Sequence, residues 1–455
     1  MFQIRQHGST VGREVLGGVT TFMAMSYIIF VQAAVLGVAG MDVGGVIMAT
    51  CIAAGVASIL MGLYANYPIA QAPGMGENFF FVFTLCGVGA AAGAFHVNWQ
   101  QALVLVFCSG VLFLILSFVG FRTYVMNAIP PSIRVGITVG IGLLVTVVGL
   151  WYGNIISFSP APSLVGWEGN HVGLLATAGT AITFVLITLR IPGGILLGML
   201  ATGAAGMATG LIGLPEQIAG LPGGIDKTAS GFILGFSQLG KSIDGGNLIE
   251  LLVFVLVLLM MDLFDTVGTL TGVCSQAGLL DKNGALPRAH RALASDAAGT
   301  ICGAALGTST VTSYIESAAG VQAGARTGLM AVVVGVLFFA AMFFQPLIQV
   351  IAGGVEVAPN VHKYPMIAPA LILVGGMMLR SVKELSFADA RNYIPAFLTM
   401  IIIPMTMSIS TGIGAGFIFY ALGHLCSRQP RKVPLIVYAI AAIFLAQYIL
   451  RAWVL

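Results

Sequence analysis

The chain has 455 residues, of which 58% are hydrophobic and only 8% are charged, and its mean hydropathy is +1.01. Soluble domains do not need so apolar a composition, and apolar runs recur along the whole sequence, which predicts a polytopic α-helical protein of the lipid bilayer. The net charge of +3 comes without a basic patch, which argues against nucleic acid as a partner. The six cysteines lack metal-ligand spacing, so we expect neither a metal nor another cofactor.

The apolar segments form two series, separated by a polar stretch with Gly and Pro at 214–248. The first series lies near 14–38, 44–64, 74–92, 99–119, 131–151, 171–189 and 193–213. The second lies near 249–279, 293–306, 314–325, 328–353, 364–380, 392–409 and 411–426. A last apolar run, 434–453, closes the chain, and the sequence alone does not decide whether it spans the membrane.

The third element of each series is interrupted, at 68–76 in the first and at 307–313 in the second. Because each series has an odd number of spans, the second is inverted relative to the first. Paired interruptions in inverted halves indicate a transport site near the bilayer midplane. The predicted fold class is therefore an all-α polytopic membrane protein with a 7+7 inverted-repeat transporter fold and about 14 transmembrane elements.

The distribution of Lys and Arg predicts the orientation of the chain. With the N-terminus in the cytoplasm and alternating spans, only four of the 19 basic residues lie on the outer side: Lys227, Lys241, Lys363 and Arg451. The others lie on the cytoplasmic side. We therefore expect a multi-pass protein of the cell (inner) membrane with a cytoplasmic N-terminus.

The second interruption, within 307–320, is unlike a lipid-facing helix. Five hydroxyl side chains precede Glu316, and the β-branched residues among them favour an extended backbone. Ser313 suits an N-cap, which predicts a helix from Tyr314 with Glu316 in its first turn. Irregular backbone at membrane depth is tolerated where protein buries it or water lines it, so this segment predicts a binding site. A polar loop outside the membrane is the alternative.

Few acidic residues lie inside apolar segments: Glu77, Asp262, Asp265, Glu316 and, near a helix end, Asp296. An ionisable group at membrane depth indicates a function by default. Asp262 and Asp265 are three residues apart and share one helical face, although a structural pair that bonds neighbouring helices remains an alternative. All six histidines fall in loops or near segment ends, so a carboxylate is the expected carrier of any coupled proton.

Gly268 and Gly272 follow these acids and predict a close approach of another backbone.

Several motifs together resemble one known family. They are Leu263 to Leu270 (LFDTVGTL), Gly307 to Gly320, Gly324 to Leu329 (GARTGL), Ala72 to Gly76 (APGMG), Pro395 to Thr399 (PAFLT) and Ile129-Pro130-Pro131 with Arg134. The chain resembles, over nearly its whole length, the nucleobase–cation symporter-2 (xanthine/uracil permease) family. More narrowly, it is similar to the azaguanine-like purine permease branch, which includes hypoxanthine, guanine and adenine carriers.

The resemblance implies a core domain, built from 1–126 and 249–358, and a gate domain, built from 127–248 and 359–455. It also implies two short antiparallel strands that meet at the substrate, in elements three and ten. Homodimers and proton symport are usual among bacterial relatives.

By the motif match, Asp265 and Glu316 hold the positions of the family's substrate and coupling carboxylates, and Asn78 matches the asparagine after Gly-Met-Gly. We expect the substrate site to comprise residues of these motifs: Glu316, Asp265, Glu77, Asn78, Thr269, Tyr314, Ser313 and Ile315. The expected proton-coupling residues are Asp265, Glu316 and Asp262.

Two positions depart from the branch. Glu77 stands where Leu is common, before Asn78 and Phe79, and Gln32-Ala33 stands where Asn-Pro is common. If Glu77 lines the site, three carboxylates meet without a basic residue, and at least one must be protonated or meet a cation. Such a pocket would prefer ligands rich in N–H donors, or cationic ones, to oxo-rich purines.

The preferred function is a secondary active transporter that imports a purine nucleobase or similar small heterocycle by proton symport with alternating access. A carrier of a different N–H-rich or cationic heterocycle is the first alternative. An intramembrane enzyme in which Asp262 and Asp265 hold Mg²⁺ fits poorly, because a second acidic cluster and phosphate-binding basic residues are missing. An anion carrier would favour positive charge where acids stand here.

Overall fold

The computed structural model describes residues 2–88, 95–119, 130–158, 161–242, 247–281, 286–359, 361–427 and 433–454. The boundary that we predict between 126 and 127 lies outside these residues. So do Ile129 of one family motif and five of the predicted cytoplasmic basic residues, namely Arg122, Lys282, Arg428, Arg431 and Lys432.

The first half of the chain runs from α1 to α9. Its elements are α1 (Val11–Met25), α2 (Tyr27–Val38), α3 (Val43–Leu60), a π-helical turn (Met61–Ala65), β1 (Gln71–Pro73), α4 (Met75–Phe79), a second π-helical turn (Phe80–Leu85), α5 (Trp99–Val119), α7 (Pro131–Tyr152), β2 (Ile156–Ser157), β3 (Ser163–Leu164), α8 (His171–Thr188) and α9 (Gly194–Ala208).

The second half runs from α11 to α18, with α10 before it and α19 after it. The elements are α10 (Ile225–Ser242), α11 (Leu248–Gln276), α12 (Ala289–Leu306), β4 (Val311–Ser313), α13 (Ser317–Gln322), α14 (Gly328–Ala341), a 3₁₀ turn (Met342–Phe344), α15 (Gln345–Ala352), β5 (Val355–Ala358), β6 (Val361–Lys363), α16 (Ala368–Met378), a 3₁₀ segment (Leu379–Glu384), α17 (Ala390–Thr406), α18 (Ile409–Cys426) and α19 (Leu435–Val454).

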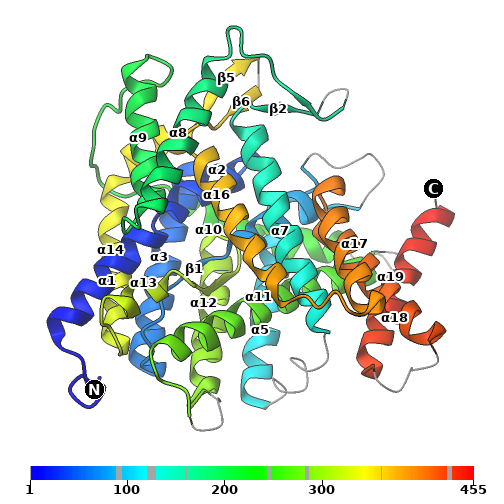
Figure 1. Cartoon of the computed structure of the whole chain (residues 1–455). Coiled ribbons are helices and arrows are strands. Elements are labelled where there is room, and N and C mark those ends of the chain that lie inside the picture. The colour runs from blue at the N-terminus through cyan, green and yellow to red at the C-terminus, as the bar shows by residue number, and fades with distance from the viewer. Residues whose placement is uncertain are drawn as a thin grey trace.

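Corresponding helices of the two halves pack in the same way. Helix α3 packs on α14 as α12 packs on α5, and α8 packs on α9 as α17 packs on α18. Figure 1 shows α3, α12, α13 and α14 gathered on one side and α17, α18 and α19 on the other, with α7 and α16 between them. This reciprocal packing is the arrangement expected of two repeats of one fold.

The two interrupted elements meet as predicted. Strands β1 and β4 pair antiparallel, with Ala72 opposite Thr312, and every residue of both strands is buried. Bonds from the Gly74 N–H to the Thr310 carbonyl and from the Tyr314 N–H to the Ala70 carbonyl, 2.9 and 3.0 Å, extend the pairing at each end. The backbone groups of both breaks are therefore satisfied within the protein, as membrane depth requires.

The start of the helix after β4 differs from the sequence prediction. Helix α13 begins at Ser317 with Glu316 as its N-cap residue, so Glu316 does not lie in the first turn and Ser313 is not the cap. The Ser313 hydroxyl donates to Asp296 instead, 2.8 Å away, and strand pairing continues through the Tyr314 N–H. Long-range bonds thus keep the chain in strand pairing through the Tyr314 N–H, and a turn at Ile315 and Glu316 then leads into α13.

The stretch between the two series contains a helix that the sequence analysis did not predict. Helix α10 packs on α3, α5 and α12, and the Phe232 and Phe236 rings lie 5.2 and 5.9 Å from the ring of Phe107 in α5. The Thr228 hydroxyl donates to the Leu306 carbonyl, 2.9 Å away. The polar and glycine-rich composition of this stretch hides an amphipathic pattern whose apolar face finds a partner only in the folded protein.

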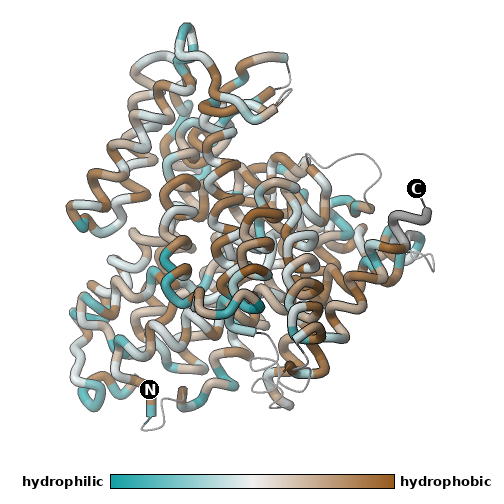
Figure 2. The backbone as a smooth tube through the Cα atoms, turned by 45° about the vertical axis from the view of Figure 1, so that its right-hand side comes forward, coloured by the Kyte–Doolittle hydropathy of each residue, from teal (hydrophilic) through white to brown (hydrophobic). Residues whose placement is uncertain are grey.

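Hydropathy agrees with a membrane protein. Among the described residues, seven helices are long and apolar enough to span a bilayer by length and composition. Figure 2 shows mostly brown and pale residues along the helices. Several other elements of the repeats, such as α9 and α16, are shorter, and the two that contain β1 and β4 are interrupted. Helix α19 packs on α18, where the Tyr448 hydroxyl donates to the Thr411 carbonyl, 2.8 Å away.

A buried carboxylate ties the first helix to the second half. The Glu14 side chain is 0% exposed and accepts from the N–H groups of Arg326 (2.8 Å) and Thr327 (3.2 Å), just before α14. The Asn66 side chain accepts from the next N–H, that of Gly328, at 2.9 Å. Oxygen acceptors from the first half thereby fix the turn that leaves α13, and this explains the Gly324 to Leu329 motif.

We expect Glu14→Ala to lower the free energy of unfolding by about 3 kcal/mol, because two buried N–H groups would lose a charged acceptor. Thermal unfolding of the purified protein measures the change. Glu216→Ala, on the exposed loop after α9, is the matched control and should leave the melting temperature unchanged. Equal melting temperatures for the two variants would contradict this account of the motif.

Candidate functional site

An accessible face of α11 lies next to the segment that follows β4. We name it the acidic recess and define it by Asp265, Gly268, Gly272, Ile315 and Glu316. Asp265, Gly268 and Gly272 share one face of α11, and a Cβ built on Gly272 would lie 3.7 Å from Ile315 of the segment after β4. The Asp265 and Ile315 side chains are accessible and Glu316 is partly so, although packed helices surround both acids. The recess therefore joins one acid from α11 to one from the N-cap of α13.

The predicted close approach of backbone at Gly268 and Gly272 is wrong. A Cβ at Gly268 would meet no atom within 4 Å, and one at Gly272 would meet only Ile315. These glycines leave open space beside Asp265 rather than letting a second backbone approach.

Tyrosine side chains border Glu316. The hydroxyl of Tyr27, the first residue of α2, donates to Glu316 Oε1 at 2.8 Å. The Tyr314 hydroxyl donates to the Pro73 carbonyl and so closes the end of β1. Asp265 has no hydrogen-bond donor among the described residues, which leaves its carboxylate available to a ligand or a proton.

A second group of acids, next to the strand pair, is fully buried. Asp296 of α12 accepts from the Gln71 amide (2.6 Å) and the Ser313 hydroxyl (2.8 Å), and Asp262 accepts from the Thr300 hydroxyl (3.1 Å). The Asp262 and Asp296 carboxyl groups lie within hydrogen-bonding reach of each other. Asp262 Oδ1 and Asp296 Oδ2 are buried without a hydrogen-bond partner among the described residues.

Glu77 lies between these two groups. It occupies the first turn of α4, folds back toward Gly74 and Thr312, and is 2% exposed. Asp265 and Asp296 are close enough to repel its charge. Its Oε2 atom is buried without a hydrogen-bond partner in the described part of the chain.

Gln32, which departs from the purine permease branch, and Asn78, which matches it, support the chain before β4. The Gln32 amide of α2 donates to the Thr308 and Ser309 hydroxyls at 2.8 and 3.0 Å, and the Ser309 hydroxyl donates to Asn78 Oδ1. Gln32 and Asn78 are both fully buried, so they hold this turn in place rather than line the recess.

The remaining predicted site residues are divided between the recess and the buried acid group. Ile315 lines the recess, and Thr269 is buried beside it on α11. Ser313 and Asp262 belong to the buried acid group. The structure also brings in Tyr27, Gln71 and Asp296. Of these, Gln71 lies directly before a motif and Asp296 had been placed near a helix end, whereas no sequence pattern indicated Tyr27.

Neither ion pair found between described residues, Lys227–Asp42 and Arg391–Asp389, involves an acid of this site. In the same part of the chain, no group of three or more His, Cys, Asp or Glu residues is arranged to hold a metal. Protons or a ligand must therefore offset the acidic charge.

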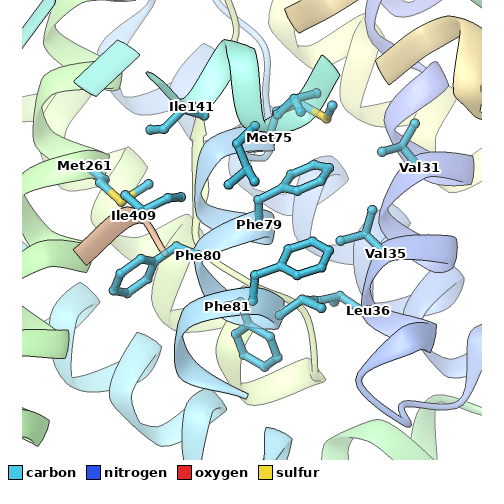
Figure 3. Close-up of a cluster of buried hydrophobic side chains, with 14 of the residues drawn as sticks. Val31, Val35, Leu36, Met75, Phe79, Phe80, Phe81, Ile141, Met261 and Ile409 are labelled. Atoms are coloured by element: carbon cyan, nitrogen blue, oxygen red, sulfur yellow. The ribbon is translucent and has the colours of Figure 1, made fainter. Parts of the chain in front are cut away.

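Three buried phenylalanine side chains of the first half, Phe79, Phe80 and Phe81, pack next to the strand pair. Figure 3 shows Phe79 and Phe81, at the end of α4 and in the turn after it, beside Val35 and Leu36 of α2, with Phe80 turned toward Met261 and Ile409. All three rings are fully buried. This packing anchors the short helix that carries Glu77.

Comparison with known proteins gives consistent results. A family model described as "Permease family", that of the xanthine/uracil permeases, matches residues 12–415. The guanine/hypoxanthine permease PbuG of Bacillus subtilis is 41% identical over 459 residues, which cover 98% of this chain and 98% of the relative. The adenine permease AdeQ of Escherichia coli is 37% identical over 451 residues, 99% of this chain and 96% of the relative.

Solved structures show the same fold. The transmembrane domain of the cyanobacterial bicarbonate transporter BicA has a TM-score of 0.60 at 15% identity, covering 89% of this chain and 96% of that one. SLC26A9 has a TM-score of 0.63 at 11% identity, covering 92% and 66%. The predicted 7+7 inverted-repeat fold is thereby confirmed, while identities this low carry no information on substrate.

The open space in the recess predicts opposite effects for two glycine substitutions. Gly268→Ala should raise the free energy of unfolding by up to about 1 kcal/mol, because alanine favours a helix and meets nothing there. Gly74→Ala should lower it by about 1–3 kcal/mol, because its Cβ would overlap the Glu77 carboxylate and lie 2.8 Å from the Thr312 methyl group. Thermal unfolding distinguishes them, and a destabilised Gly268→Ala would mean that this face of α11 is packed rather than open.

Proposed function

The chain belongs to the xanthine/uracil permease (nucleobase–cation symporter-2) family, and we propose that it is a secondary transporter that imports a purine nucleobase. One observation carries the proposal: Asp265 and Glu316 meet in an accessible recess that offers acceptors and no basic side chain among the described residues. Purine edges present N–H donors, and carboxylates accept them in short, charge-assisted bonds. Relatives named for guanine, hypoxanthine and adenine support the same substrate class.

Coupling to a proton follows from the excess of acids. Asp265 lies beside the expected ligand and lacks a donor from the described residues, so it is the group that we assign to carry or control the coupled proton. Glu316 accepts N–H donors from the bound ring. Asp262, which is fully buried and accepts from the Thr300 hydroxyl, is the further coupling position that we propose. When a carrier binds a proton and its substrate in one site, the charge of the bound proton changes the affinity for the substrate, and this couples their transport.

Alternating access would proceed by movement of a core domain, 1–126 with 249–358, against a gate domain, 127–248 with 359–455. Helices α3, α5, α12 and α14 pack mainly on one another, and so do α7, α16, α17 and α18, which supports this division. Helix α10 falls within 127–248 but packs on α3, α5 and α12, so we place it with the moving core. Contacts between gate domains would hold a homodimer, which a mass measurement in lipid-like conditions tests.

The named relatives are permeases, which removes the enzyme alternative. A second substrate class, other N–H-rich or cationic heterocycles, is favoured by one specific observation. The Glu77 oxygen without a partner adds a third acceptor close to the recess, where a donor-rich or positively charged ring would offset its charge.

We expect Glu316→Gln to abolish binding, because it replaces the charged acceptor of the ring's N–H groups, a loss of a few kcal/mol or roughly 100-fold or more in affinity. Asp265→Asn should still bind substrate but fail to concentrate it against a gradient. A thermal-shift screen of the purified protein against nucleobases measures binding, and uptake into proteoliposomes with an imposed proton gradient measures concentration.

Gly268→Ala is a steric control in the same screen, because the added methyl group should weaken binding in the recess while both acids remain. Uptake equal to wild type in both Glu316→Gln and Asp265→Asn would refute the site assignment.

Glu77 should influence the ranking of ligands. Glu77→Leu restores the residue that is common in the branch and removes one acceptor, so N–H-rich and cationic heterocycles should lose their advantage over xanthine or urate. Competition binding with both proteins measures the ranking. An identical order of purines and cationic heterocycles in wild type and variant would show that Glu77 does not set selectivity.

A further inference from the structure

The first helix is broken beside the recess. Helix α1 ends at Met25, Ser26 links it to α2, and Tyr27 is the first residue of α2. The Tyr27 ring is 1% exposed, yet its hydroxyl reaches Glu316 Oε1 at 2.8 Å, a residue 289 positions away in the other half. Tyr314 and Asp265 also lie close enough to Tyr27 to interact with it electrostatically. The Tyr27 hydroxyl therefore belongs to the wall of the recess.

Glu316 differs from its acidic neighbours in this contact. Among the described residues, no side-chain hydroxyl or amide donates to Asp265, and Glu77 Oε2 has no partner. A phenol that donates to a carboxylate forms a charge-assisted bond and stabilises the negative charge there. The bond also removes the free rotation of the carboxylate, because Oε1 is held against α2.

With Oε1 engaged by Tyr27, Oε2 is the Glu316 oxygen that receives no side-chain donor from the described residues. An unconstrained carboxylate can rotate to meet N–H groups at several positions of a ring, whereas a carboxylate with one oxygen fixed presents the other in one direction. Fixing an acceptor in advance increases discrimination, because a ligand without a donor at that point leaves a charged group unpaired.

We propose that Tyr27 is a positioning residue that orients Glu316 and thereby sets which N–H pattern on a heterocycle the transporter accepts. The inference rests on the proposed function, since it assumes that Glu316 receives the ring. A purely structural role is the competing explanation: the Tyr27 ring would fill space, and its hydroxyl would only satisfy a buried carboxylate.

The test compares Tyr27→Phe with Tyr152→Phe. Tyr152 of α7 is 2% exposed and its hydroxyl has no hydrogen-bond partner among the described residues, so its variant controls for loss of a buried hydroxyl outside the recess. The probes are hypoxanthine, guanine and adenine, each with ring-N-methylated derivatives that lack one N–H. For each base and each of its methylated derivatives, the dissociation constant of the derivative is divided by that of the parent base. This ratio is compared between proteins, so the effect of the methyl group's bulk cancels.

For at least one ring position, wild type and Tyr152→Phe should show a ratio of about 10 to 100. Tyr27→Phe should bind the parent base about tenfold more weakly and reduce that ratio at least fivefold, because its carboxylate can turn to another donor. Melting temperatures without ligand establish that both variants are folded.

Two outcomes overturn the inference and are distinguishable. If wild type binds the bases and Tyr27→Phe keeps every ratio, Tyr27 does not position Glu316, while the proposed function stands. If wild type binds none of the bases, the proposed function fails and this inference with it.

Discussion

The pairing of β1 with β4 is the constraint on which the rest of the core depends. Two three-residue strands, one from each half, satisfy each other's backbone groups where neither lipid nor a helix could do so. Their pairing fixes the starts of α4 and α13, and hence the places of Glu77 and Glu316. Removing either strand would leave the opposite half without a defined site.

The buried acids and the acids of the recess differ in how many donors the protein gives them. Gln71, Ser313 and Thr300 donate to Asp262 and Asp296, which are fully buried. In the recess, protein donors are scarce, with Tyr27 on Glu316 as the side-chain example among the described residues. A transport site must leave some of its acceptors to the cargo, because acceptors already satisfied by the protein would gain little from binding it. The recess therefore keeps carboxylate acceptors that the protein does not satisfy, and these can bind a substrate and release it again.

The sequence alone predicted a polytopic membrane protein, its two inverted series of segments and the interrupted third element of each. These predictions depend on segment length, hydropathy and runs of β-branched residues, which are local properties. The sequence placed Glu316 near a helix start but missed the cap by a few residues, since the bonds of Ser313 to Asp296 and of Tyr314 to Ala70 join distant segments. Helix α10 was missed because its apolar face faces α5 rather than lipid. Tyr27 carries no local signal, as its contact with Glu316 exists only once the halves meet. The acidic residues of the site were recognised from the sequence because a charged side chain inside an apolar segment is rare.

The separation of the strands along the chain has a consequence for biosynthesis. Ala72 and Thr312, which face each other in the folded protein, are 240 residues apart. At 5–20 residues per second, β1 leaves the ribosome on the order of tens of seconds before β4 exists. During that interval its peptide groups have no partner strand, and exposing them to hydrocarbon would cost several kcal/mol each. The nascent first half must therefore keep this segment at the membrane surface, or in contact with the insertion machinery, until the second half arrives.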